Sequence, residues 1–112
     1  PVVRQGDDQW SDIVRWAHFA MVNAEELGVT SKNVEKMKAD KNPSIRRLLG
    51  VDGTFGENMG IGNDWAYHII RTVGNYSETF ERNVGKSTPL GIARGVNALW
   101  TQGGLQYAPP VR

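Results

Sequence analysis

Apolar residues near the start of the chain recur every three or four positions, which is the spacing of one face of an α-helix. The pattern predicts one long helix that Asp7 or Asp8 caps and that ends before Gly28. Trp16 and Phe19 add apolar surface beside this face, so the helix needs packing partners on two sides. The residues of the face itself are Trp10, Ile13, Val14, Ala17, Ala20, Met21, Ala24 and Leu27.

Two shorter helices are predicted in the next part of the chain. The stretch "TSKNVEKMKA" is typical of a short polar helix, and we expect Thr30 or Ser31 to cap it. The stretch "NPSIRRLLG" carries clearer signals, with Asn42 at the cap, Pro43 at the first helical position and Gly50 just past the end.

A glycine-rich loop is predicted over Gly50–Gly62, followed by a strongly apolar helix. Asn63 or Asp64 opens this helix, and Gly74 ends it. One face of the helix collects Trp65, Ala66, Ile69, Ile70 and Val73.

Two further helices are predicted toward the carboxyl end. Asn75 stands three residues before Glu78, close to the pattern of a capping box, so a helix should run through Val84. The stretch "STPL" restarts the chain, and residues 98–100 belong to a last helix that ends at the pair Gly103-Gly104.

Both ends of the chain are predicted to be extended. Pro1–Gln5 is a strand or a linker, because two valines favour extended structure and Pro1 cannot donate a ladder hydrogen bond. The tail "LQYAPPVR" is extended as well. The fold class is therefore mostly α, with five or six helices, an extended N-terminal segment and an extended C-terminal tail.

Composition excludes several classes of function. The 112 residues make one domain at most, and 13 basic against 12 acidic residues give a net charge of +1. This balance argues against a nucleic-acid partner, since the longest basic run is Arg46-Arg47. The absence of cysteine excludes disulfides and thiolate chemistry. No apolar run approaches the roughly 18 residues of a membrane span.

Two motifs resemble nucleotide or ion sites but do not match them. "GKST" at Gly85–Thr88 resembles the end of a phosphate-binding loop, yet the full motif needs a glycine where Phe80 stands and a strand before it. The glycines of the predicted loop fit neither a dinucleotide fingerprint nor a calcium loop, because Asp52-Gly53 lacks the alternating oxygen ligands. We interpret both as ordinary loop sequence.

Residues that could carry chemistry are few and scattered. His18 and His68 are the two histidines, and neither has a second ligand at zinc-binding spacing. Asp7-Asp8 is explained by helix capping, and the four tryptophans lie on apolar faces typical of a core. Asn75 begins a glycosylation sequon, which matters only in a eukaryotic secretory pathway. We therefore assign no catalytic residue, no metal ligand and no cofactor.

Four stretches taken in order carry a resemblance to a known family. They are "PVVRQGDDQWSDIVRWAHFAMVNAEELGVT", "NPSIRRLLG", "NDWAYHIIRTVGNYSETFERNVG" and "IARGVNALWTQGGLQYAPPVR". The chain resembles the carboxyl-terminal third of the general L-amino-acid-binding proteins, periplasmic solute-binding proteins of bacterial ABC transporters. The final block, with Trp100, Gly103-Gly104, Tyr107 and Pro109-Pro110, is its most specific part.

This resemblance implies a longer protein with two α/β lobes joined by crossover strands. Residues 1–6 would be the end of the crossover, and residues 7–112 the helical C-terminal part of lobe 1, with an export signal upstream. The family's ligand contacts would lie before Pro1, so no ligand-binding residue is assigned here. Arg4 to Asp7 would lie nearest the cleft, by proximity only.

The resemblance implies transport in the periplasm rather than catalysis. The longer protein would capture L-amino acids with broad specificity and deliver them to ABC transporter permease subunits, touching the membrane complex only peripherally. The chain alone is expected to bind no ligand and to self-associate, since its helices would lack the sheet they cover. Two alternatives are a stand-alone helical interaction module and an enzyme on the same scaffold, whose catalytic set would have to lie upstream.

Overall fold

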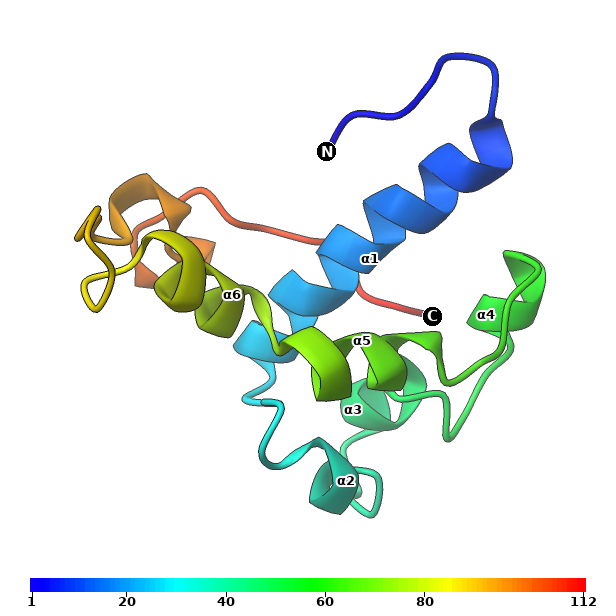
Figure 1. Ribbon diagram of the computed structural model, residues 1–112. Helices are drawn as coiled ribbons and strands as arrows, with labels where there is room; N and C mark the ends of the chain where they lie inside the picture. Colours follow the sequence, from blue (N-terminus) through cyan, green and yellow to red (C-terminus); the bar gives the residue numbers. More distant parts are fainter.

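A computed structural model describes all residues, 1–112, as an almost entirely helical chain (Figure 1). The one β-type pairing is an isolated bridge between Leu99 and Gln106. This confirms the predicted mostly α class. The helices are α1 (Asp8–Glu26), α2 (Val34–Met37), α3 (Pro43–Leu48), α4 (Phe55–Asn58), α5 (Trp65–Val73) and α6 (Tyr76–Val84), followed by two 3₁₀ helices, η1 (Gly95–Asn97) and η2 (Trp100–Gln102).

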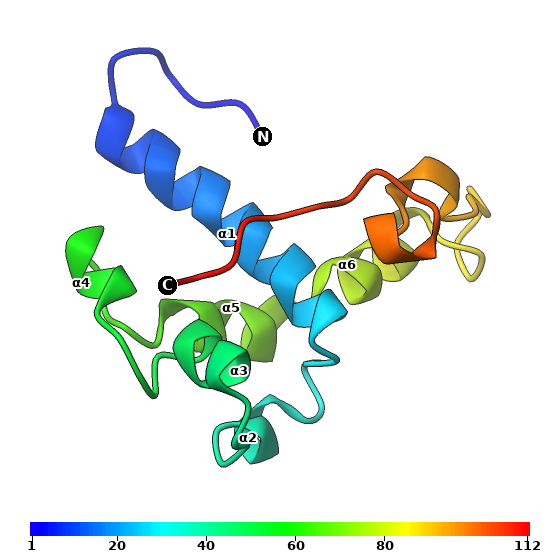
Figure 2. The ribbon, with the colours of Figure 1, turned by 180° about the vertical axis from the view of Figure 1, so that it is seen from behind.

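Helix α1 is the centre of the molecule, and the other elements lie around it. Helices α5 and α6 cross one face of α1, while the carboxyl-terminal tail crosses the opposite face (Figures 1 and 2). The predicted cap is confirmed at Asp7, whose carboxylate accepts a hydrogen bond from the Trp10 amide at 3.0 Å. The chain leaves the helix through Gly28, whose φ of 72° suits glycine.

The main core lies where α1, α3 and α5 meet. Ala20 and Ala24 of α1 and Ala66 of α5 are fully buried, and such small side chains let the helices approach closely. Larger side chains fill the space around them, including Ile70, which is 0% exposed. The buried residues of this cluster are Ala20, Ala24, Val29, Val34, Ile45, Leu48, Leu49, Trp65, Ala66, Tyr67, Ile70 and Val111.

Local signals predicted the limits of three helices correctly. The Asn42 side chain caps α3 by accepting from the Ser44 amide at 2.9 Å. Helix α5 ends at Gly74, which has a φ of 88°. Helix α6 carries a complete capping box, in which Asn75 and Glu78 each bind the other's backbone amide.

Two predictions in the middle of the chain were wrong. Helix α2 begins at Val34, after Asn33, and neither Thr30 nor Ser31 caps it. Thr30 and Asn33 instead form a turn in which each side chain accepts from the other's amide, at 3.3 and 2.7 Å. The glycine-rich loop also contains the short helix α4, because Phe55 packs against Trp65 and Trp16 and so fixes one helical turn.

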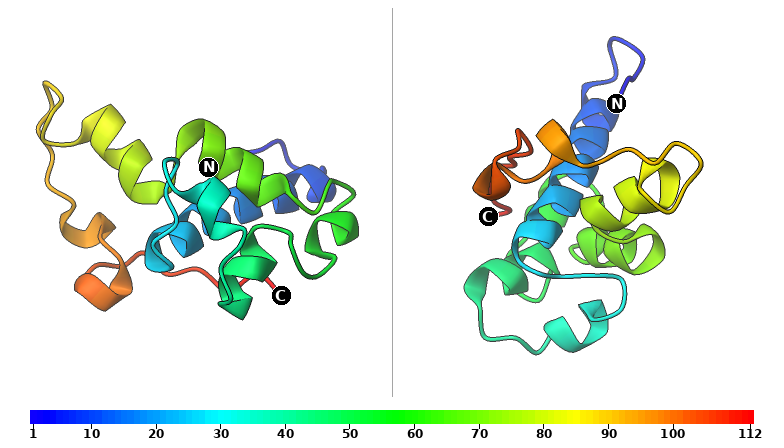
Figure 3. Two further views of the ribbon diagram at one scale, coloured as in Figure 1. Left: turned by 90° about the horizontal axis from the view of Figure 1, so that it is seen from below. Right: turned by 90° about the vertical axis from the view of Figure 1, so that its left-hand side faces the viewer.

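The predicted helix around residues 98–100 is absent. Ala98 and Leu99 are extended, with ψ of 163° and 149°, and 3₁₀ turns flank them. The chain folds back here, so the Trp100 amide binds the Gln106 carbonyl at 3.0 Å and the Gln106 amide binds the Ala98 carbonyl at 3.1 Å. Residues 85–107 form one end of the molecule, away from α4 (Figure 3).

Candidate functional site

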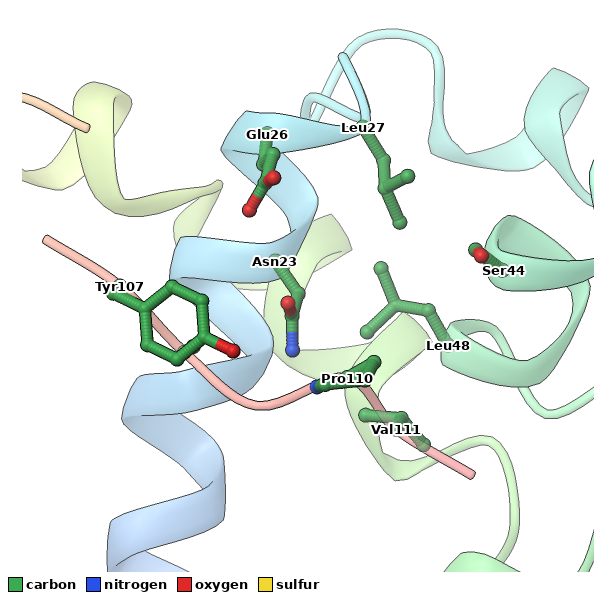
Figure 4. Close-up of a pocket in the computed structure, with 9 residues that line it drawn as sticks. Asn23, Glu26, Leu27, Ser44, Leu48, Tyr107, Pro110 and Val111 are labelled. Carbon is green, nitrogen blue, oxygen red and sulfur yellow. The ribbon is translucent and has the colours of Figure 1, made fainter. Parts of the chain in front are cut away.

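A pocket of about 210 Å³ opens between the end of α1, the start of α3 and the carboxyl-terminal tail. Asn23, Glu26 and Tyr107 lie on one side of this pocket, and Leu27 and Leu48 lie on the other together with Ser44 (Figure 4). The lining residues are Asn23, Glu26, Leu27, Ser44, Leu48, Tyr107, Ala108, Pro110 and Val111.

The tail is held against α1 by burial and by one specific hydrogen bond. Ala108 and Val111 are 3% and 5% exposed, so their side chains anchor the tail on both sides of the prolines. The Asn23 amide nitrogen donates to the Pro109 carbonyl at 2.8 Å. The floor of the pocket is therefore preformed by packing between segments that are far apart in the sequence.

Two acceptors in the pocket have no partner within the chain. Asn23 is 7% exposed, and its side-chain oxygen accepts no hydrogen bond, because only its nitrogen is engaged. Glu26 forms no ion pair, in contrast to its neighbour Glu25. Sequence reasoning missed these residues; the one available signal was a polar Asn23 between apolar positions of the same helix.

A second polar cluster fastens the chain that follows α6. Arg94 and Glu25 form a two-pronged ion pair with N–O distances of 2.9 and 3.0 Å. Their side chains are only 17% and 10% exposed. Arg94 also donates to the Asn97 carbonyl at 2.9 Å and lies over the Tyr76 ring at 5.4 Å. All charges in this cluster are paired, which marks it as a structural clamp.

The two histidines lie in separate environments. His18 is half-buried with its ring edge-on to Tyr76 at 5.6 Å, and burial lowers its pKa below the ordinary 6.5. His68 is on the surface of α5, 2.8 Å from Asp64 of the same helix turn. No group of three or more His, Asp or Glu side chains is arranged to hold a metal ion.

The remaining motifs have structural explanations. Gly85 ends α6, and the Thr88 hydroxyl donates to the Gly85 carbonyl at 2.7 Å, so "GKST" forms a turn with no strand before it. Asn75 is 4% exposed and engaged in the capping box, which leaves the sequon inaccessible in the folded chain. Arg4 to Asp7 are exposed and converge on no other group except through the Asp7 cap.

The assignment of all four tryptophans to a core was wrong. Trp65 is buried, and Trp16 packs between Phe19 and Phe55, but Trp10 and Trp100 are 53% and 52% exposed. Trp100 meets Tyr107 edge to face at 6.0 Å. Helical periodicity could not reveal the exposure of Trp100, because the segment around it is not an α-helix.

The chain is a set of helices with no sheet of its own. A search of family models finds no match. The chain is 59% identical over its whole length to the general L-amino acid-binding periplasmic protein AapJ of Rhizobium johnstonii, and 58% identical to the putative amino-acid ABC transporter-binding protein YhdW of Escherichia coli. It spans 33% of the length of each of these curated relatives.

A solved structure gives the same result at the level of the fold. An ABC transporter periplasmic binding protein from Brucella ovis, with glutathione bound, matches 98% of this chain with a TM-score of 0.94 and 56% identity. The match covers 35% of that protein. In sequence and in fold, the chain therefore corresponds to the carboxyl-terminal third of periplasmic solute-binding proteins. Within that class, the curated relatives that it matches are amino-acid-binding proteins, which confirms the resemblance.

The structure also bears on the membrane. None of the six α-helices combines enough length with enough apolar character to cross a bilayer.

Proposed function

We propose that this chain is the carboxyl-terminal part of a longer periplasmic protein that captures L-amino acids and delivers them to an ABC transporter permease. The observation that carries the proposal is the 59% identity to a general L-amino acid-binding periplasmic protein over the entire chain. Broad side-chain tolerance follows if affinity comes from the carboxylate and ammonium groups that all amino acids share. The proposal includes no catalytic step.

In this longer protein, residues 1–6 end an interlobe crossover and residues 7–112 cover the sheet of the first lobe. Exposed apolar side chains support this arrangement, since Val2 is 99% and Trp10 is 53% exposed. Large exposed apolar groups are typical of surfaces that another element covers. Arg4 to Asp7 lie nearest the ligand cleft, while the ligand contacts themselves come from the rest of the protein.

The chain by itself is then expected to bind no amino acid and to self-associate. At the other end of the molecule Val96, Trp100, Leu105 and Tyr107 are 52–75% exposed, which adds a second apolar surface. Pairing of such surfaces between copies removes apolar area from water. This burial stabilises the pair by about 25 cal/mol for each Å² of apolar surface. Light scattering that gives a stable monomer across a wide concentration range would contradict the self-association.

Isothermal titration calorimetry on the longer gene product tests the transport function. We expect saturable binding of several L-amino acids that differ in side chain, and no heat from the corresponding D-amino acids. The 112-residue chain is the matched control and should give no binding. A longer product that binds no amino acid would overturn the proposal and leave a helical interaction module as the better interpretation.

A further inference from the structure

The pocket between α1, α3 and the tail differs in chemical character from the clamp and from the exposed apolar surfaces, although Tyr107 borders both the pocket and the second of these surfaces. None of its nine lining residues is Lys, Arg or His, and one of them is a carboxylate without an ion-pair partner, Glu26. Pro109 and Pro110 contribute no backbone N–H to the tail that forms its floor. The pocket therefore has no cationic side chain and holds one carboxylate without an ion-pair partner.

The acceptors converge on one space. Figure 4 shows the Glu26 carboxylate, the Asn23 amide and the Tyr107 hydroxyl turned toward the same side of the pocket. The Asn23 oxygen belongs to a side chain that is 7% exposed, and it accepts no hydrogen bond in the structure. Because the Asn23 nitrogen is already bound to Pro109, the amide is fixed with its oxygen left free for a ligand.

The opposite wall is mainly apolar, with the Ser44 hydroxyl at its edge. Leu27 and Leu48 point into the pocket, and the Pro110 ring and the Val111 side chain lie below them (Figure 4). A ligand that fits must therefore present N–H donors and positive charge at one end and a short hydrocarbon part at the other. A volume of about 210 Å³ suits a group the size of one side chain, since drug-sized sites begin at roughly 300 Å³.

We propose that this pocket binds a short aliphatic cation, a guanidinium or ammonium group on an alkyl stem. The cation donates to the Glu26 carboxylate and to the free Asn23 oxygen, and its stem lies against Leu27 and Leu48. The site is built entirely from residues of this chain and does not depend on the proposed transport function. Its occupant is an alkyl cation that carries no carboxylate, or an arginine or lysine side chain of another protein; a free amino acid is excluded because its α-carboxylate would be repelled by Glu26.

Chemical-shift titration of the ¹⁵N-labelled chain with propylguanidinium tests the proposal. We expect saturable shifts confined to residues 23–27, 44–48 and 107–111, with a dissociation constant on the order of millimolar. The neutral isostere propylurea and the anion butyrate should bind at least about fivefold more weakly. Equal binding of propylurea, or shifts spread over the whole chain, would overturn the proposal.

Two substitutions locate the interaction. Glu26 is exposed, so Glu26→Gln should fold normally and lower the affinity for propylguanidinium by roughly fivefold. Asp12→Asn removes the same charge from an exposed site of the same helix, away from the pocket, and should leave the affinity unchanged. Tyr107→Phe, which removes only the hydroxyl, should have an effect between these two. An unchanged affinity in Glu26→Gln contradicts the proposed site.

A second titration distinguishes the sources of the cation. N-acetylarginine amide carries the same guanidinium on a blocked peptide backbone. Binding at least as tight as that of propylguanidinium supports the site with a protein side chain as its occupant. Exclusion of the blocked arginine, with propylguanidinium still bound, supports the site with a free alkyl cation. Binding of neither compound overturns it.

Discussion

Helices α1, α2, α3 and α5 share the main apolar core, whereas the carboxyl-terminal segment, residues 85–112, is held by a small apolar cluster of Leu99 and Ala108 with Val22 and by polar contacts. Of the twelve residues in the main core cluster, Val111 alone comes from this segment. The segment instead contains most of the large apolar side chains that remain exposed: Leu90, Ile92, Val96, Trp100, Leu105 and Tyr107.

The contrast shows two ways of fixing a chain. In the helical part, small and branched side chains exclude water, and helix packing follows from that burial. In the carboxyl-terminal segment, the clamp between Arg94 and Glu25, a small buried cluster around Leu99 and a few backbone pairs hold a fold whose outer side chains stay in water. A segment built in this way is ordered but leaves apolar surface for a partner.

The largest expected effect comes from breaking the core. Ile70→Ala removes a fully buried side chain and should lower the free energy of unfolding by about 4 kcal/mol, because the cavity cannot collapse fully. Urea unfolding followed by circular dichroism measures the change. Ile92→Ala is the matched control, since Ile92 is 44% exposed, and a similar loss there would contradict the contrast between the two parts.

Breaking the clamp should loosen the carboxyl-terminal segment and leave the core intact. Arg94→Ala strands Glu25 without a partner and should lower the free energy of local opening by about 3 kcal/mol, the low end for a buried pair. Hydrogen exchange at the amides of Leu105 and Gln106 should accelerate, while that of α5 should not. Arg15→Ala, which removes an ion pair whose side chains are 60% and 58% exposed, should change neither rate.

A smaller effect is expected where the backbone of the segment folds back on itself. A Cβ on Gly104 would lie 1.9 Å from the Ala98 carbonyl oxygen, so Gly104→Ala should destabilise the turn by about 2 kcal/mol. Gly103 has a φ of 87° and open space around it, so Gly103→Ala adds strain without a clash and should cost about 1 kcal/mol. Exchange of the Trp100 and Gln106 amides compares the two variants. Equal effects would show that backbone strain, rather than the close approach, decides this turn.

The smallest effect on stability is expected at acid pH, and it comes from Glu78 in the helical part. Burial alone would raise the pKa of Glu78, but hydrogen bonds from Ser31 and from the Asn75 amide outweigh it and hold the pKa below its usual 4.5. Glu78 therefore contributes stability that is fully present above pH 4.5 and is lost as the pH falls through its lowered folded value. Urea unfolding between pH 6 and pH 3 should show a steeper loss for the native chain than for Glu78→Gln. Parallel curves would mean that the capping box contributes no pH dependence.

Much of the helical part could be predicted because its signals are local. Asn42 with Pro43, Gly74, and Asn75 with Glu78 each satisfy or terminate backbone groups within a few residues, so short sequence windows contain the whole interaction. Helix α4 and the turns η1 and η2 escaped prediction because distant contacts fix them. The aromatic neighbours of Phe55 and the backbone partners of Leu99 are not visible in such a window.

The pocket was even harder to predict from local sequence than α4 or the 3₁₀ turns. Asn23 and Pro109 are 86 residues apart, and their hydrogen bond forms the pocket floor. A polar residue on an apolar helix face was the only hint in the sequence, and many such residues merely face solvent at the edge of a helix. Convergence of the Asn23 oxygen, Glu26 and Tyr107 depends on the path of the tail across α1.

The sequence by itself determined the helical class, the long central helix with its limits, two further capped helices, the end of α5 at Gly74, and the resemblance to the carboxyl-terminal third of an amino-acid-binding protein. These features depend on periodicity, caps and residue identity, which short-range physics and direct comparison can read. Only the tertiary structure decided the non-helical course of residues 85–107, the exposure of Trp10 and Trp100, and the pocket. These features share one physical reason. They depend on contacts between segments that are far apart in the sequence, and a short stretch of sequence carries no information about the energy of such contacts.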